Sequence, residues 1–266
     1  RRPDDVEMLE KYAEALLLVR PLEPRNIGAA IGAYRRLLRL DPEDEFLYEQ
    51  LAKLYTAIGD LDELGYIAQK RLEYQPDDPK ASIWLSQALI AQHKPNKVRQ
   101  ILLALTKKLE EQDEKHQQYV QACALLSGIA ARKEADQARM EAVKWLDRAV
   151  AYDPQSAEAL MNRARFYRIG PVIRGQTRES MLAAARSDLQ RASALESKDP
   201  QVHLILSIEW LEHGRLDLAA AELDATKDLD EAAVAEYFVD PNNWAAARFL
   251  QAAELAMRSE TASESV

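Results

Sequence analysis

Apolar and small residues recur along the chain at helical spacing, and one arrangement returns six times. It is a triplet in which a small or aliphatic residue is followed by a second residue four positions later and by a third after three more. The six triplets are Ala30–Tyr34–Leu37, Leu64–Ala68–Arg71, Val98–Leu102–Leu105, Ala142–Leu146–Ala149, Ala185–Leu189–Ala192 and Ala219–Leu223–Thr226. Residues at these spacings share one face of an α-helix, so each triplet predicts a helix with one buried side.

Successive triplets begin 34, 34, 44, 43 and 34 residues apart, which indicates an internal repeat with two insertions. A second pattern precedes the triplet in four copies of the repeat: a large residue, a small one directly after it and a large one three positions further on. Its members are Leu51–Ala52–Tyr55, Leu85–Ser86–Leu89, Arg163–Ala164–Tyr167 and Leu206–Ser207–Trp210. Each copy therefore predicts two helices, and the small residue lets the neighbouring helix approach closely.

Turn residues separate these predicted helices. Gly59–Asp60 and Gly214–Arg215 lie between the two patterns, where glycine can end a helix with a positive φ. Between copies, Pro follows Asp or Gln, and we expect Asp to cap the next helix with Pro in its first turn. These pairs are Asp41–Pro42, Gln75–Pro76, Asp153–Pro154, Asp199–Pro200 and Asp240–Pro241.

Over about residues 7–258 these motifs resemble the tetratricopeptide repeat (TPR) family, whose repeat is a 34-residue helix–turn–helix. That family has a large–small–x–x–aromatic stretch in the first helix, Ala-x3-Phe-x2-Ala in the second and a closing Pro. The sequence departs from it at Arg71 and Thr226, where the family prefers Ala, and at Arg163, which replaces a large apolar residue. The fourth copy is also longer than the others.

The resemblance implies an all-α fold, a right-handed α-solenoid of about six TPR helix–turn–helix copies plus a C-terminal capping helix, with the first helix of each copy on the concave side. The predicted parts are an N-terminal extension 1–6, copies at about 7–42, 43–76, 77–112, 113–154, 155–199 and 200–233, a capping helix 242–258 and a disordered polar tail 259–266. Gly28 and Gly32, four residues apart, predict close packing of a helix in the first copy.

The two insertions have different composition. Ala130–Ala142 lacks Gly and Pro, so we expect longer helices there. Ile169–Ser180 contains two Gly and one Pro, so we expect a loop. A loop of this length is either functional or a tolerated surface insertion, and the sequence leaves both open.

Composition narrows the class of protein. The 266 residues are 47% hydrophobic and 30% charged, typical of a soluble folded chain, and a single Cys excludes a disulfide framework. A net charge of −9 argues against binding of nucleic acid or an anionic membrane, and no apolar run reaches membrane-spanning length. The chain begins with Arg1 rather than Met, so we expect a processed or trimmed piece, from the cytoplasm or the periplasm, with any anchor upstream of it.

Catalytic motifs are not recognisable in the sequence. None of the four His residues has a His or Cys partner at helical metal-ligand spacing. We read His203 as a core histidine and Cys123 as a buried, inert thiol. The sequence predicts no enzyme activity, no cofactor and no metal.

The first helices of the copies supply the candidate binding residues. In the second copy these are Glu49, Gln50 and Lys53. In the later copies they are Ile83, Trp84, Gln87, Ile90, Met161, Asn162, Arg165, Arg168, Leu204, Ile205, Ile208 and Leu211. Trp84 lies off the helix-packing column, so it either anchors a partner side chain or packs against the adjacent helix.

Seven Arg against two acidic residues lie between Arg163 and Arg191, and from this segment Arg174 and Arg178 are candidate contacts for an anionic group. The alternative is that these Arg residues cap helix ends and pair with nearby acids. The predicted function is a non-catalytic scaffold that binds a peptide or helix of a partner protein in the concave groove. The alternatives are self-assembly into a homo-oligomer through the solenoid ends, or a regulatory or adaptor subunit of a larger complex.

Overall fold

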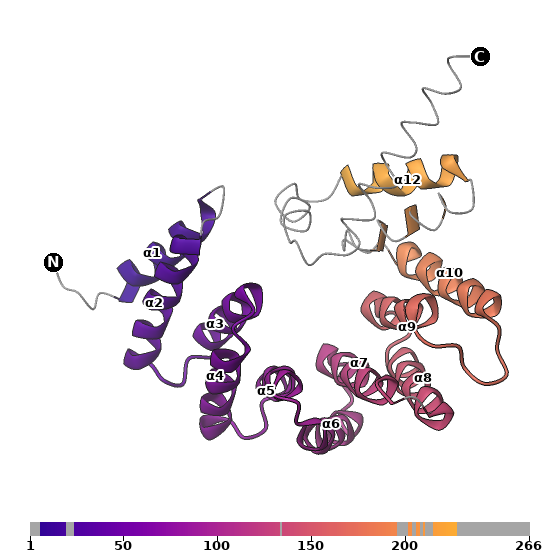
Figure 1. Cartoon of the computed structure of the whole chain (residues 1–266). Coiled ribbons are helices and arrows are strands. Elements are labelled where there is room, and N and C mark those ends of the chain that lie inside the picture. Colours follow the sequence, from indigo (N-terminus) through magenta and orange to yellow (C-terminus); the bar gives the residue numbers. More distant parts are fainter. Residues whose placement is uncertain are drawn as a thin grey trace, which may run out of the picture. The chain divides into compact units, whose positions relative to one another are not determined.

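The computed structural model describes residues 6–19, 24–133, 135–195 and 215–227, together with 202–203, 206–207 and 210. All regular secondary structure in these ranges is α-helical, which confirms the predicted class. The helices are α1 (Val6–Leu18), α2 (Pro24–Leu40), α3 (Glu45–Ile58), α4 (Leu61–Tyr74), α5 (Pro79–Ala91), α6 (Pro95–Glu110), α7 (Gln117–Ala131), α8 (Asp136–Tyr152), α9 (Ala157–Ile169), α10 (Arg178–Ala194) and α12 (Leu216–Lys227) (Figure 1). The predicted capping helix 242–258 and tail 259–266 lie outside the described residues.

The chain divides into two compact units, Arg1–Ala122 and Cys123–Val266, with the boundary inside α7. In the first unit α1 packs on α2, α2 on α3, and so on to α6, each helix on its neighbour in the chain. In the second unit α8 packs on α9 and α9 on α10 in the same way. Contacts are therefore local in sequence, as expected for a stack of helix pairs.

The triplets form the core. Every triplet residue whose side chain is described is buried, Arg71 included, and Ala30, Leu64, Val98, Ala142 and Ala185 have no exposed surface at all. The second pattern is buried as well at Leu51, Ala52 and Tyr55. Because a pair of helices this small cannot bury its apolar side alone, each pair depends on its neighbours for stability.

Helix ends follow the turn residues, with one correction. Gly59 ends α3 with φ of 71°, and the Asp60 carboxylate caps α4 by accepting the Glu63 amide at 3.1 Å. The expectation that the residue before Pro caps the next helix is wrong for the pairs Asp41–Pro42, Gln75–Pro76 and Asp153–Pro154, because the caps of α3, α5 and α9 are Asp44, Asp78 and Ser156, three residues further on. At Asp78 the cap does precede a Pro, Pro79, in the first turn of the helix. Asp41 and Asp153 instead accept the amides of Glu43 and Gln155 and hold the turns that contain Pro42 and Pro154.

Arg71 and Arg163, two of the three departures from the repeat pattern, form ion pairs. Arg71 Nε donates to Asp78 Oδ2 at 2.8 Å, and Arg71 Nη1 donates to the Glu43 carbonyl at 2.8 Å. Each guanidinium therefore forms hydrogen bonds where the repeat pattern has apolar packing. Arg71 bonds to Asp78 of the next copy, and Arg163 bonds to Asp188 of its own copy.

Glycine supports close packing at Gly65 rather than at Gly28 and Gly32. A Cβ on Gly65 would lie 2.9 Å from Ala88 Cβ, so α4 and α5 approach through this position. A Cβ on Gly28 or Gly32 would meet no heavy atom within 4 Å, and both residues are exposed, so the predicted close packing there is wrong.

The two insertions differ in structure, as their compositions predict. The loop between α9 and α10 is confirmed and covers residues 170–177. In the other insertion the expected longer helices are found in part. α8 has 17 residues, and α7 and α8 together occupy most of Ala130–Ala142, with a break between Ala131 and Asp136.

Candidate functional site

A groove of about 470 Å³ in the first unit is formed by the first helices of three successive pairs, α3, α5 and the start of α7. Its lining residues are Glu49, Ala52, Lys53, Thr56, Ala57, Lys80, Ile83, Trp84, Gln87, Gln118 and Gln121. This volume is in the range typical of ligand pockets.

Helix capping sets the register of the groove wall on α5. The Asp78 carboxylate accepts the Ala81 amide at 3.1 Å, and Pro79 occupies the first turn of the helix. From this start, residues 80, 83, 84 and 87 follow the three- and four-residue spacing of one helical face. Lys80, Ile83, Trp84 and Gln87 therefore lie together along the groove.

Lys80 on α5 forms hydrogen bonds with two acidic residues of α3 at one end of the groove. Its ammonium donates to Glu45 Oε1 at 3.0 Å and to Glu49 on α3. These hydrogen bonds raise the pKa of Lys80 above its ordinary value, so the group stays charged at neutral pH. These two ion pairs connect α3 to α5, and the Lys80–Glu49 pair neutralises the Glu49 charge within the groove.

Trp84 is both a packing residue and a groove residue. It is half-buried, packs against the core of the first unit, and lines the groove. The packing interpretation of its sequence position therefore holds in part, and its role as an anchor for a partner side chain stays a prediction. Ile83 is buried, with only 3% of its surface exposed, so it forms the groove floor, and Ile90 is half-buried and does not line the groove.

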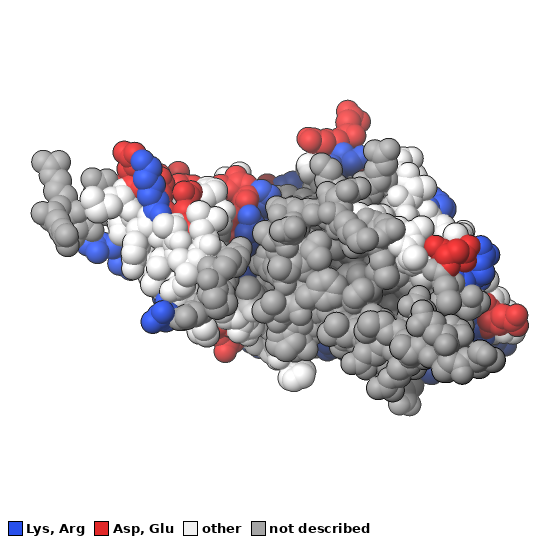
Figure 2. All heavy atoms as spheres, turned by 90° about the horizontal axis from the view of Figure 1, so that it is seen from above, with Lys and Arg blue, Asp and Glu red and all other residues white. Residues whose placement is uncertain are grey.

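Several polar side chains of the groove are not engaged elsewhere in the protein. Lys53, Gln87, Gln118 and Gln121 form no side-chain hydrogen bond or ion pair with any described residue. Figure 2 shows acidic and basic side chains next to one another on the visible face. Ion pairs elsewhere in the chain include Lys70–Glu73, Lys108–Asp77 and Arg215–Asp217. The groove therefore combines an aromatic ring, free amides and one unpaired cation.

Three residues that line the groove were not among the predicted binding residues: Lys80, Gln118 and Gln121. Lys80 precedes Trp84 by one helical turn, so the α5 register could have included it. Gln118 and Gln121 lie on the first helix of the fourth copy, which the stretched sequence left without a clear register.

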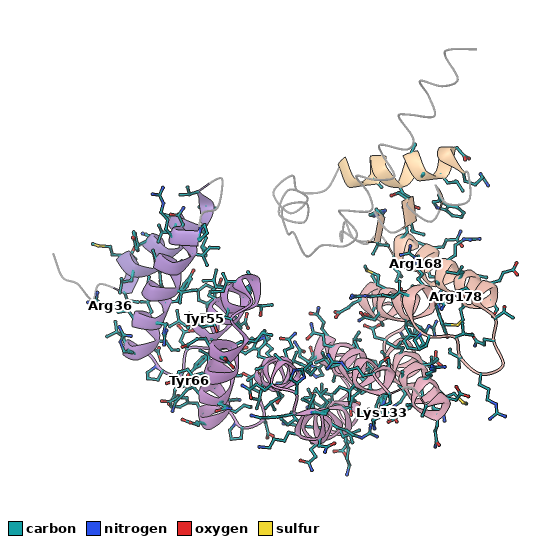
Figure 3. All side chains as sticks on the ribbon, in the orientation of Figure 1. Arg36, Tyr55, Tyr66, Lys133, Arg168 and Arg178 are labelled. Carbon is teal, nitrogen blue, oxygen red and sulfur yellow. The ribbon has the colours of Figure 1, made fainter. Side chains whose placement is uncertain are left out.

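The candidate residues of the second unit form a separate set. Met161, Asn162 and Arg168 are half-buried on α9, and Arg165 is exposed there. Four further candidates lie outside the described residues: Leu204, Ile205, Ile208 and Leu211. Arg178 donates to the carbonyls of Tyr167, Arg168 and Gly170 at 2.8–3.2 Å and so caps the end of α9 (Figure 3).

The other candidate chemistry has structural roles. His203 is buried and its Nδ1 lies 2.9 Å from Glu222 Oε2, and Cys123 is buried. Within the described ranges, His, Cys, Asp and Glu side chains do not gather in any group of three or more that could hold a metal ion. The described helices include none that is both long and apolar enough to cross a membrane.

Comparison with known proteins identifies the fold. No protein-family model matches the sequence, and no curated protein aligns with it significantly. A TPR protein from Parabacteroides merdae aligns with 94% of this chain and 85% of its own, at 14% identity and a TM-score of 0.60. PilW, a type IV pilus biogenesis factor, aligns with 86% of this chain and 97% of its own, at 16% identity and a TM-score of 0.51.

Human IFIT1, solved as a dimer with m7Gppp-AAAA, aligns with 93% of this chain at 13% identity and a TM-score of 0.54. The present chain spans 58% of the length of that IFIT1 chain. These similarities, together with the buried triplets, show that the chain has the all-α solenoid fold of TPR proteins. At these identities they show the fold alone.

Proposed function

We propose that this chain is a non-catalytic scaffold that binds a peptide segment of a partner protein in the groove of α3, α5 and α7. The observation that carries the proposal is the position of Trp84, which is held by the core on one side and faces the groove on the other. A fixed aromatic ring in a concave site is the usual anchor of a protein interface, because little side-chain entropy is lost on binding.

The polar residues of the groove support a peptide as the occupant. Carboxamides both donate and accept hydrogen bonds, so Gln87, Gln118 and Gln121 can pair with the N–H and C=O groups of a bound backbone. Lys53 supplies a positive charge for an acidic side chain of the same segment. The solved TPR structures include proteins in assemblies, among them the Cut9–Hcn1 hetero-tetramer, which is consistent with a scaffold role.

Nucleic acid is the less favoured ligand. Human IFIT1 was solved with m7Gppp-AAAA, but binding to phosphate chains is driven by a surplus of Lys and Arg. Here the net charge is −9, and of the two Lys that line the groove, Lys80 is paired with Glu45 and Glu49. The expectation that the chain binds no nucleic acid stays a prediction.

A peptide selection tests the proposal. Random peptides of about twelve residues, displayed on phage, are selected on the full chain, and the affinity of the enriched peptides is then measured with Trp84→Ala. We expect the substitution to weaken binding by at least about tenfold, as for an interface anchor.

Tyr66→Ala is the matched control. Tyr66 is an aromatic residue on α4, is 53% exposed, and does not line the groove (Figure 3). The control should bind the selected peptides as the wild type does. Equal affinity of the Trp84 and Tyr66 variants would show that the groove is not the binding site.

A further inference from the structure

We propose that the second unit carries another binding cleft, between α8 and the loop 170–177, which takes an acidic segment of a partner protein that also carries an apolar side chain. The cleft has a volume of about 480 Å³ and is lined by Asp136, Gln137, Met140, Glu141, Lys144 and Arg174. It shares no residue with the groove of the first unit.

The loop forms a fixed wall of this cleft. The Gly170 amide donates to the Phe166 carbonyl at 2.7 Å, and a Cβ on Gly170 would lie 2.4 Å from that oxygen, so only glycine fits. Ile173 is buried, and Arg178 holds the start of the loop through the Gly170 carbonyl. Arg174 is exposed beside these anchored residues and is therefore presented by a loop fixed on both sides of it.

The opposite wall is one face of α8. Gln137, Met140, Glu141 and Lys144 follow the three- and four-residue spacing of a helix side. Met140 is 42% exposed, although methionine is usually buried. Its flexible thioether side chain can adapt to an apolar side chain of a partner.

The unpaired charge in the cleft is positive. Of the two acidic residues that line the cleft, Asp136 forms an ion pair with Arg139 at 3.4 Å. The other, Glu141, also interacts with another group of the protein. Lys144 and Arg174 have neither a hydrogen-bond nor an ion-pair partner within the part of the chain that the structure describes. Their charges would be neutralised by carboxylates of the occupant.

An acidic protein can bind an acidic segment here because distant charges are screened. At physiological ionic strength the screening length is about 8 Å, so the distant acidic residues of the chain contribute little at the cleft, where Lys144 and Arg174 are the cations without a partner among the described residues. An isolated small anion would leave Met140 uncovered, whereas a peptide with acidic residues next to an apolar one contacts both features. The occupant is therefore a protein segment rather than a free anion.

Peptides are selected on the full chain carrying Trp84→Ala, which removes the proposed anchor of the groove of the first unit. We expect enrichment of sequences with at least two Asp or Glu near an apolar residue. Binding of these peptides should fall by at least about tenfold in the double variant Lys144→Glu, Arg174→Glu, and should weaken as salt is added.

Arg132→Glu, Lys133→Glu is the control, with the same change in charge at two exposed residues of the α7–α8 turn outside the cleft (Figure 3). It should retain most of the affinity. The proposal is overturned if no acidic peptide is enriched, or if control and cleft variants lose affinity equally. Because Trp84 is already replaced, either result is independent of the function proposed for the first unit.

Discussion

Arg163 and Asp188 form a two-point ion pair between α9 and α10, with Nε to Oδ2 and Nη2 to Oδ1 both at 2.8 Å. Asp188 is buried, and Asp147 on α8 accepts a third hydrogen bond from the same guanidinium at 2.9 Å. These bonds raise the pKa of Arg163 above its ordinary value. One side chain thus connects three helices at a position where the repeat pattern calls for an apolar residue.

Arg163→Leu restores the large apolar residue that the repeat favours, yet we expect it to destabilise the chain. Asp188 would keep a buried charge without its main partner, which costs about 3–5 kcal/mol. The double variant Arg163→Leu, Asp188→Leu should recover most of that loss. Urea unfolding followed by circular dichroism checks both, with Arg165→Leu as a neutral exposed control. A single variant as stable as the wild type would contradict this role.

Arg71→Ala matches the family pattern in the second copy and should also destabilise the chain, by about 3 kcal/mol. It removes the Arg71–Asp78 ion pair, in which both side chains are buried. Asp78 also caps α5, so a second substitution must keep the cap. Arg71→Ala, Asp78→Ser keeps an N-cap oxygen without the charge, and its melting temperature should exceed that of Arg71→Ala. A higher melting temperature for Arg71→Ala than for the double variant would show that the unpaired charge of Asp78 is not the cause of the destabilisation.

Gly65→Ala and Gly32→Ala should have opposite effects. The new methyl group at position 65 would lie 2.9 Å from Ala88 Cβ, so α4 and α5 must separate, at a cost of about 1–3 kcal/mol. At position 32 the methyl group meets nothing, and the gain in helix propensity is up to about 1 kcal/mol. Thermal unfolding of the two variants measures both effects, and equal melting temperatures would contradict the packing described for α4 and α5.

Alkaline pH should unfold the chain through its buried tyrosines. Burial raises the pKa of Tyr34, Tyr48 and Tyr55 above 10.0, the value of a free side chain. Because the folded state favours the neutral phenol, this contribution to stability is complete below pH 10 and is lost as the pH rises above it. Phenolate absorbance at 295 nm should rise together with loss of helical circular dichroism. Ionisation of every tyrosine while the helices stay intact would contradict the prediction that these buried side chains couple ionisation to unfolding.

The sequence predicted the stack of helix pairs because its signal is local. Ala30–Tyr34–Leu37 lie within two helical turns, and burial of this spacing is what a helix pair requires. The partner of Arg163 was not predictable in this way, since Asp188 lies 25 residues away and meets it only after α9 and α10 pack. Arg163 departs from the repeat pattern in the sequence, and its ion pair with Asp188 in the fold explains why.

The groove was predictable in part. Glu49, Lys53, Ile83, Trp84 and Gln87 were found from the register of the second and third copies, and they do line one groove. The contribution of α7 was missed, because six residues, 111–116, separate it from α6 and shift its register against the repeat. The hydrogen bonds of Arg178 at the end of α9 were not predictable either, because the acceptors are backbone carbonyls, which every residue has.

Nuclear magnetic resonance of the full chain with a peptide from the selection tests the central claim most directly. The side-chain amide signals of Gln87, Gln118 and Gln121 and the indole signal of Trp84 report on the groove. We predict that these signals shift on addition of peptide while the amide of Gln69 on α4, which does not line the groove, stays in place. Shifts that spare all four groove side chains while the peptide binds would contradict the account.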